Sequence, residues 1–87
     1  MNDFTFTAKA FQDYLYWQTE DKKTLKKINS LLVDIKRNGV LDGTGKPEKL
    51  KNRPGYSRHI DDANRLVYVL DELQNIKIIS CKGHYED

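Results

Sequence analysis

The sequence predicts an α+β domain in which two N-terminal helices pack on one face of a small, mostly antiparallel four-stranded sheet. Three observations lead to this fold. Apolar residues recur with a helical period in the first 40 residues, three β-prone segments occupy the last third, and the turns between those segments are short. A chain of 87 residues has room for one hydrophobic core, so residues 1–87 are expected to form a single domain.

The N-terminal half is predicted to form one short strand followed by two helices. The alternation Phe4-Thr5-Phe6 is typical of a short strand, and the hydroxyl of Thr7 suits a helix N-cap. The first helix should end near Glu20, and Asp21 can cap a second helix that stops at Gly39 in a left-handed cap conformation. The short link between the helices predicts an antiparallel hairpin. The apolar positions are Ala10, Phe11, Tyr14, Leu15, Trp17, Leu25, Ile28, Leu31, Leu32 and Ile35.

The segment 39–55 is rich in glycine and proline and is predicted to be a connecting loop. It carries an uneven charge. The net charge of the whole chain is only +2, but residues 45–59 hold a single acid, Glu48, among a group of basic residues. These are Lys46, Lys49, Lys51, Arg53 and Arg58. Such a patch fits a phosphate-binding surface and also an ordinary solvated loop, and composition leaves both interpretations open.

The C-terminal third is predicted to form three strands over residues 56–60, 64–70 and 76–82. Residues 61–63 and 71–75 separate them as turns, which are short enough to require antiparallel neighbours. The complete order is therefore β-α-α-β-β-β. With both helices on one face of the sheet, the other face is available as a binding surface.

The cysteine and histidine content narrows the possible chemistry. Cys81 is the only cysteine, so no internal disulfide can form, and its apolar neighbours favour a small buried side chain over a nucleophile. His59 and His84 are 25 positions apart and complete no familiar zinc spacing, so no metal and no other cofactor is expected. No signal peptide or membrane-spanning stretch is evident, which predicts a cytoplasmic protein that does not enter membranes.

Cleavage of RNA without a metal needs three side-chain roles. A base removes the proton of the ribose 2′-hydroxyl, a cation stabilises the five-coordinate phosphate, and an acid protonates the departing 5′-oxygen. The sequence offers Glu48 in the basic connector, Arg65 on a predicted strand and His84 after the last strand. Taken singly, each also fits an ordinary surface residue.

Several segments resemble one family. Residues 45–51, Gly-Lys-Pro-Glu-Lys-Leu-Lys, look like the G-K-P-E-x-L-K segment of the Txe/YoeB family of toxins, within the RelE/ParE superfamily. Further similar segments are Asp13–Trp17, Lys26–Asn29, Tyr56–Ile60, Asn64–Tyr68 and the pair His84-Tyr85. The similarity spans nearly the whole chain in the same order, which is more specific than any one motif. It implies a RelE-like fold, consistent with the elements predicted above.

The resemblance also implies a function. Members of this family are ribosome-dependent mRNA endonucleases, the toxin components of bacterial toxin–antitoxin pairs. By position, it implies that Glu48 is the general base, His84 the general acid and Arg65 the residue that stabilises the transition-state phosphate. The residues that the resemblance places in contact with RNA are Lys51, Arg58, His59 and Tyr85. The aromatic ring of Tyr85 would orient the RNA or stack on a base.

Two features depart from the family pattern. The family usually has a second arginine after Arg58, where this chain has His59. Because imidazole is mostly neutral at pH 7, one fixed phosphate contact is then in doubt. The chain also continues past the His-Tyr pair to Glu86 and Asp87. These carboxylates could favour the acid form of His84 or repel RNA, and the sequence leaves both open.

The expected partners are a cognate YefM/Phd-like antitoxin with an acidic segment, the ribosome and messenger RNA, and a homodimer is possible. Tyr14, Tyr16 and Trp17 fit either the core or a contact with such a protein partner. Two other functions remain open. One is a non-catalytic, ParE-like gyrase poison, whose relatives lack the Glu, Arg and terminal His set. The other is an inactive toxin that survives as an antitoxin-bound repressor, and His59 is the one feature in its favour.

Overall fold

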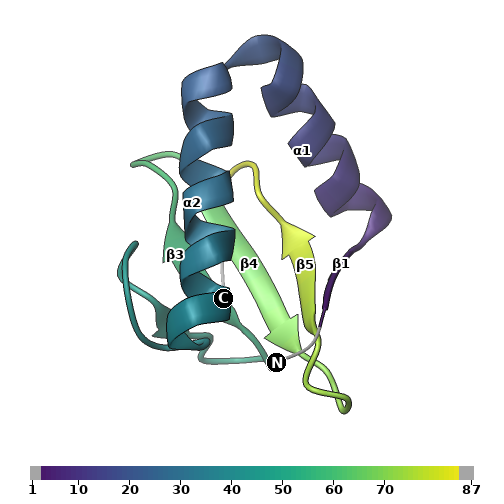
Figure 1. Cartoon of the computed structure of the whole chain (residues 1–87), viewed down its shortest axis with the longest axis vertical. Helices are drawn as coiled ribbons and strands as arrows, with labels where there is room; N and C mark the ends of the chain where they lie inside the picture. The colour runs from purple at the N-terminus through teal and green to yellow at the C-terminus, as the bar shows by residue number, and fades with distance from the viewer. Residues whose placement is uncertain (1–2, 85–87) are drawn as a thin grey trace.

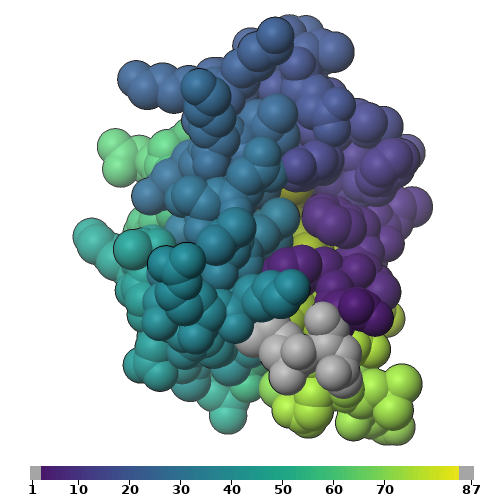
Figure 2. Space-filling view, in the orientation of Figure 1, coloured from purple at the N-terminus to yellow at the C-terminus, as the bar shows by residue number. Residues whose placement is uncertain are grey.

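The computed structural model describes residues 3–84, which form two helices and five strands. In chain order these are β1 (Phe4–Phe6), α1 (Ala8–Glu20), α2 (Lys22–Asn38), β2 (Glu48–Lys49), β3 (Tyr56–His59), β4 (Arg65–Leu70) and β5 (Ile76–Ser80). Both helices lie on the same face of the sheet (Figure 1). Figure 2 shows that their side chains cover this face almost completely, with the C-terminal strand visible in a narrow gap between them. No helix within residues 3–84 is long and apolar enough to span a membrane.

The start of α1 is fixed by the predicted cap. The Thr7 hydroxyl oxygen accepts a hydrogen bond from the Ala10 N–H at 3.1 Å, and the hydroxyl donates to the Ile79 carbonyl at 3.0 Å. The same side chain therefore satisfies a free amide of the helix and ties the helix to β5.

The ends of α2 also confirm the prediction. The Asp21 carboxylate accepts hydrogen bonds from the hydroxyl and backbone N–H of Thr24 and from the Lys23 N–H, and together these lower the pKa of Asp21. The helix stops at Gly39, whose N–H donates to the Ile35 carbonyl at 2.8 Å. The predicted conformation of Gly39 was wrong in detail. Its φ is +92° but its ψ is −177°, an extended value that still requires glycine.

The sheet has the strand order β1-β5-β4-β3-β2. Only β1 and β5 are parallel, and the other three pairs are antiparallel. This confirms the mostly antiparallel α+β fold with both helices on one face. The strand count differs from the prediction because β2, a two-residue strand inside the predicted connector, pairs with the edge of β3. Two residues next to Pro47 show no alternation that would distinguish them from a loop.

The two faces of the sheet have different surroundings. Leu66 and Tyr68 of β4, with Ile76 and Ile78 of β5, point toward the helices and join the main core. The residues of α1 and α2 buried in the same core are Ala10, Trp17, Ile28, Leu31 and Ile35. Successive side chains of a strand point to opposite faces, so β4 directs its odd-numbered residues, beginning with Arg65, to the face that the helices leave open.

Arg58 lies on the helix-covered face and contradicts one prediction. Its side chain is completely buried and forms an ion pair with Asp34 of α2. The guanidinium also donates to the Tyr68 hydroxyl and to the carbonyls of Gly39, Asp42 and Thr44, at distances from 2.7 to 2.9 Å. These hydrogen bonds hold the first part of the connector around the guanidinium of Arg58. The phosphate contact predicted for it was wrong, because every nitrogen of the guanidinium is used inside the protein.

Candidate active site

A cavity of about 370 Å³ opens on the face of the sheet opposite the helices. Its lining includes Glu48, Arg65 and His84, the three residues predicted from sequence to carry the chemistry. The other lining residues are Lys49, Leu50, Lys51, Ser57 and His59. The cavity therefore unites side chains from β2, the connector, β3, β4 and the segment after β5, which are up to 36 positions apart in the sequence.

Glu48 reaches the cavity because the connector is locked just before it. The His59 N–H donates to the Gly45 carbonyl at 2.7 Å, and Glu48 pairs with Ser57 in the β2–β3 register. Gly45 has a φ of +81°, and a Cβ at this position would lie 2.8 Å from Leu31 and 3.2 Å from the carbonyl oxygen of His59. A side chain would push the segment away, so glycine here is needed to bring the exposed carboxylate of Glu48 to the cavity.

Arg65 is the first residue of β4 and the register partner of His59 on β3. Its Nη1 donates to the carbonyls of Asp61 at 2.6 Å and Asn64 at 3.1 Å. These two bonds hold the half-buried guanidinium at the end of the strand while leaving its other N–H groups for a ligand. A cation with a fixed position and remaining donors is suited to binding a phosphate.

The turn before β4 is organised by Asp61. Its carboxylate accepts hydrogen bonds from the N–H groups of Ala63 and Asn64 and from the Asn64 side-chain amide, at 2.7 to 3.1 Å. Burial by itself would raise the pKa of Asp61, but these hydrogen bonds and the nearby Arg65 charge outweigh it and lower the pKa. The turn is therefore held in one conformation by an ionised carboxylate, and it presents the carbonyls that bind Arg65.

His84 is attached to the same turn. Gly83 donates its N–H to Asn64 Oδ1 at 2.7 Å and accepts from the Arg65 N–H at 3.1 Å. His84 Nε2 lies 3.0 Å from the Asp62 carbonyl oxygen. A carbonyl can only accept, so in this contact Nε2 carries a proton. The predicted acid and the predicted phosphate-binding cation are thus positioned by one turn.

Helix α1 holds the start of this C-terminal segment from the other side. The Asp13 carboxylate accepts from the Cys81 N–H at 3.0 Å, and the Trp17 indole N–H donates to the Cys81 carbonyl at 2.9 Å. One residue later, the ammonium of Lys82 lies 4.5 Å from the centre of the Tyr16 ring. We call residues 81–84 the C-terminal strap, because each of its residues has a contact with α1 or with the turn before β4.

These contacts also answer two questions that the sequence left open. Cys81 is buried, and burial together with the Asp13 charge raises the pKa of its thiol to about 12, which confirms the structural interpretation over a nucleophile. Trp17 belongs to the core, and Tyr14 is packed against it. Tyr16 is 43% exposed and is therefore available for contact with a partner.

The predicted RNA-binding residues are divided by the structure. Lys51 and His59 line the cavity, whereas Arg58 is in the core. Tyr85 lies outside the described residues, as do Glu86 and Asp87. Sequence reasoning missed Asp61 and Asn64, which position the cation and the strap. Their spacing, an aspartate followed three residues later by an asparagine between two strands, is a turn signal that could have identified them.

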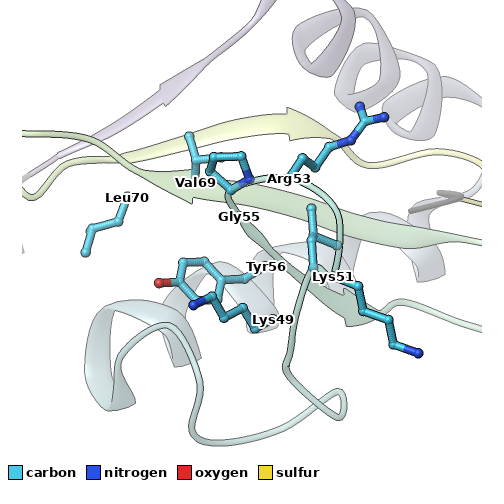
Figure 3. A pocket seen from close by; sticks show the side chains of 9 residues that line it. Lys49, Lys51, Arg53, Gly55, Tyr56, Val69 and Leu70 are labelled. Atoms are coloured by element: carbon cyan, nitrogen blue, oxygen red, sulfur yellow. The ribbon is translucent and has the colours of Figure 1, made fainter.

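A second pocket of about 460 Å³ adjoins the cavity and shares Lys49, Leu50 and Lys51 with it. Its remaining lining residues are Arg53, Pro54, Gly55, Tyr56, Val69 and Leu70. Figure 3 shows the side chains of Lys49, Tyr56 and Val69 around this pocket, with Lys51 extending from the connector. Positive charge therefore continues beyond the cavity, on the side of β2.

The cavity holds a carboxylate, two imidazoles and cations around one open space. This set can accept a proton, donate a proton and bind an anion without any further group. Within residues 3–84, no three His, Cys, Asp or Glu side chains are placed to hold a metal ion.

Comparisons with known proteins give one consistent family. The sequence model of a family described as the YoeB-like toxin of bacterial type II toxin–antitoxin systems matches residues 6–85. Toxin YoeB of Synechocystis is 48% identical over 83 residues, covering 93% of this chain and 94% of that protein. Two Staphylococcus aureus structures are also similar. A heterotetrameric YoeB–YefM toxin–antitoxin complex has a TM-score of 0.86 at 56% identity, covering 94% of this chain and 95% of that chain. A YoeB dimer has a TM-score of 0.88 at 55% identity, covering 95% and 97%.

Proposed function

Because this chain belongs to the YoeB-like toxins of bacterial type II toxin–antitoxin systems, we propose that it is an endoribonuclease that cuts messenger RNA on the ribosome. The observation that carries this proposal is the single cavity lined by Glu48, Arg65 and His84. These residue types are the base, the cation and the acid that cleavage by an internal 2′-hydroxyl needs.

In the proposed reaction Glu48 takes the proton of the 2′-hydroxyl, and the 2′-oxygen forms a bond to the adjacent phosphorus. Arg65 stabilises the negative charge that accumulates on the phosphate oxygens. As the bond between phosphorus and the 5′-oxygen breaks, His84 gives a proton to that oxygen. The products are a 2′,3′-cyclic phosphate and a free 5′-hydroxyl, so atoms and protons balance without any other reactant.

RNA binding is assigned to the cations beside these three groups. Lys51 lines the cavity and can attract phosphates. His59 occupies the position facing Arg65, where its imidazole can donate to a phosphate oxygen, most strongly when it is protonated. Tyr85 is retained as a residue that orients RNA, on the resemblance alone.

The expected location is the cytoplasm, where the proposed partners are the ribosome, its messenger and an antitoxin. Exposed lysines on α2 give the helix face a positive charge that RNA would attract. The Staphylococcus aureus relatives were solved as a complex with YefM and as a dimer, and we propose both kinds of assembly for this chain. An acidic antitoxin segment that orders on binding would complement the basic connector.

Primer extension on messenger RNA in a cell-free translation reaction tests the proposed function. Wild type should produce cuts at ribosome-occupied codons, and His84→Ala should lose them. Val33→Ala, at an exposed position of α2 away from the cavity, is the matched control and should cut like wild type. Intact messenger with wild type would remove the nuclease proposal. A gyrase assay would then separate the two remaining alternatives, a gyrase poison and an inactive repressor.

A further inference from the structure

We infer that the pocket beside Glu48 binds the nucleotide on the 5′ side of the cut, so that messenger RNA crosses the open face with its 5′ end toward the β2 edge. This inference rests on the proposed function and adds a binding site and a strand direction to it. Four observations support it: the chemistry of the pocket, the lining residues that it shares with the cavity, its rigidity and its position relative to the base and the acid.

The lining of the pocket matches a nucleotide. Three cations, Lys49, Lys51 and Arg53, line it, and none of its nine lining residues is acidic. Apolar surface on the open side is supplied by Leu50, Pro54 and Val69. Tyr56 and Leu70 line the pocket from the side of the helices, where they pack against the core. A ligand that satisfies both parts has a negative charge and a flat, weakly polar body. A phosphate joined to a base has this combination, and single-strand binding sites combine positive grooves with such surfaces.

The pocket lies next to the cavity. Lys49, Leu50 and Lys51 line both spaces, so the two adjoin at this segment. Val69 and Arg65 point to the same face of β4 and are four residues apart, which corresponds to about 13 Å along a strand. If the scissile phosphate of an RNA strand lies at Arg65, the neighbouring part of that strand is therefore long enough to reach the pocket.

The wall of the pocket is already formed without RNA. The Leu50 N–H donates to the Gly55 carbonyl at 2.9 Å and closes the loop 50–55. Gly55 has a φ of +128°, and a Cβ there would lie 3.0 Å from Val69 Cγ1 and 3.2 Å from Leu50 Cδ1. Leu50, which lines the pocket next to Gly55, is itself buried. A preformed wall lowers the entropic cost of ordering a ligand.

The direction of the strand follows from the chemistry. The attacking 2′-hydroxyl belongs to the nucleotide on the 5′ side of the scissile phosphate, so that nucleotide must lie next to the base Glu48. The leaving 5′-oxygen belongs to the following nucleotide, next to the acid His84. The pocket begins at Lys49, immediately after Glu48, whereas His84 is attached to the turn before β4. The pocket is therefore on the 5′ side of the cut.

Photo-crosslinking tests this placement on the ribosome. A synthetic messenger carries 4-thiouridine either directly 5′ or directly 3′ of the cut, with a 2′-deoxy sugar at the 5′ nucleotide to prevent cleavage. With wild-type protein, the 5′ probe should crosslink to residues 49–56 or to Val69, and the 3′ probe should not. A crosslink from the 3′ probe to this pocket would overturn the inference. The absence of any crosslink to the pocket from either probe would also overturn it.

A substitution gives a second, independent test. Val69→Trp should fill the pocket and lower the cleavage rate of unmodified messenger about ten-fold by excluding one base. Val33→Trp places the same side chain on exposed α2 and should cut at the wild-type rate. If Val69→Trp cuts normally but binds the antitoxin weakly, the pocket is a protein site and the inference fails. If wild type itself does not cut, the proposed function fails instead.

Discussion

Arg58 and Arg65 lie on adjacent strands of one sheet, yet their environments are opposite. Arg58 is completely buried, and its guanidinium is bound by Asp34, Tyr68 and three backbone carbonyls. Arg65 is half-buried on the open face, with Nη1 bound to two carbonyls of a turn and the rest of the group at the cavity. One arginine organises the protein interior, and the other is placed to meet a ligand.

The difference between them is a matter of strand register. In the β3–β4 pairing, Arg58 is opposite Leu66, whereas Arg65 is opposite His59. Opposed residues share a face and successive residues alternate, so the two arginines must point in opposite directions. The same charge therefore stabilises the fold on one face and is available for chemistry on the other. Substitutions at the two positions should affect different properties.

The largest expected effect is on stability, from Arg58→Met. The substitution removes the cation paired with Asp34 and the donors to Tyr68 and to three backbone carbonyls. Breaking a buried pair costs about 3–5 kcal/mol. Urea unfolding should show this loss relative to wild type. Arg37→Met removes a cation from an exposed position of α2 and is the matched control, expected within about 0.5 kcal/mol of wild type. A cost below about 1 kcal/mol for Arg58→Met would contradict the buried network.

The second effect is on activity, from Arg65→Ala. Removing a group that stabilises transition-state charge typically lowers the rate by roughly 100- to 1,000-fold. Its loss from the open face should lower the free energy of unfolding by less than about 1 kcal/mol, because only hydrogen bonds to a surface turn disappear. Single-turnover cleavage of ribosome-bound messenger and urea unfolding measure the two quantities. Normal cleavage by this variant would contradict the catalytic role of Arg65. A large loss of stability would instead show that Arg65, like Arg58, mainly stabilises the fold.

A smaller effect is expected from Asn64→Ala, which removes the side chain that joins the turn to Gly83. We expect about a five-fold slower cleavage, since one net hydrogen bond is worth about 1 kcal/mol. On the residual single-turnover rate of a His84→Ala background, the added loss should be smaller, because part of the effect of the Asn64 side chain is exerted through the strap and His84. Asn75→Ala removes a comparable acceptor from the distant β4–β5 turn and should cut normally. Equal losses in both backgrounds would mean that Asn64 does not position His84.

The smallest expected effect is on the free energy of unfolding at acid pH, through the carboxyl group of Asp34. The Arg58 guanidinium, followed by the Thr44 N–H, lowers the pKa of Asp34 below its ordinary value of 3.8. A lowered pKa contributes stability above pH 3.8 and loses it as the pH falls through the folded-state value. Wild type should therefore lose stability below about pH 4 more steeply than Asp34→Asn. Parallel curves for the two proteins would show that Asp34 is not held ionised.

Much of the fold could be read from local signals. Thr7, Asp21 and Gly39 act through their own chemistry at helix ends, and the structure confirms each boundary. The strand β2 could not be predicted, because Glu48–Lys49 becomes a strand only through pairing with β3. The grouping of Glu48, Arg65 and His84 came from the family resemblance, since side chains from separate segments meet only in the folded sheet.

The error at Arg58 has a clear physical source. Alternation along residues 56–60 places Tyr56, Arg58 and Ile60 on one face, and both neighbours of Arg58 in this set are apolar. That pattern indicates the covered face, whereas the charge of Arg58 by itself predicts an exposed side chain. The interpretation missed that Asp34, 24 residues earlier, supplies the partner that makes burial possible. Such a partner is not visible from local sequence.

The central claim is that side chains of the open face cut RNA through its own 2′-hydroxyl, and one substitution in the messenger tests it. A ribosome-bound messenger with a 2′-deoxy sugar at the nucleotide 5′ of the cut keeps every phosphate but lacks the attacking oxygen. Wild-type protein should cut the all-ribose messenger at this position and leave the deoxy messenger intact. Cleavage of the deoxy messenger at the same bond would contradict the account, because another nucleophile would then be responsible.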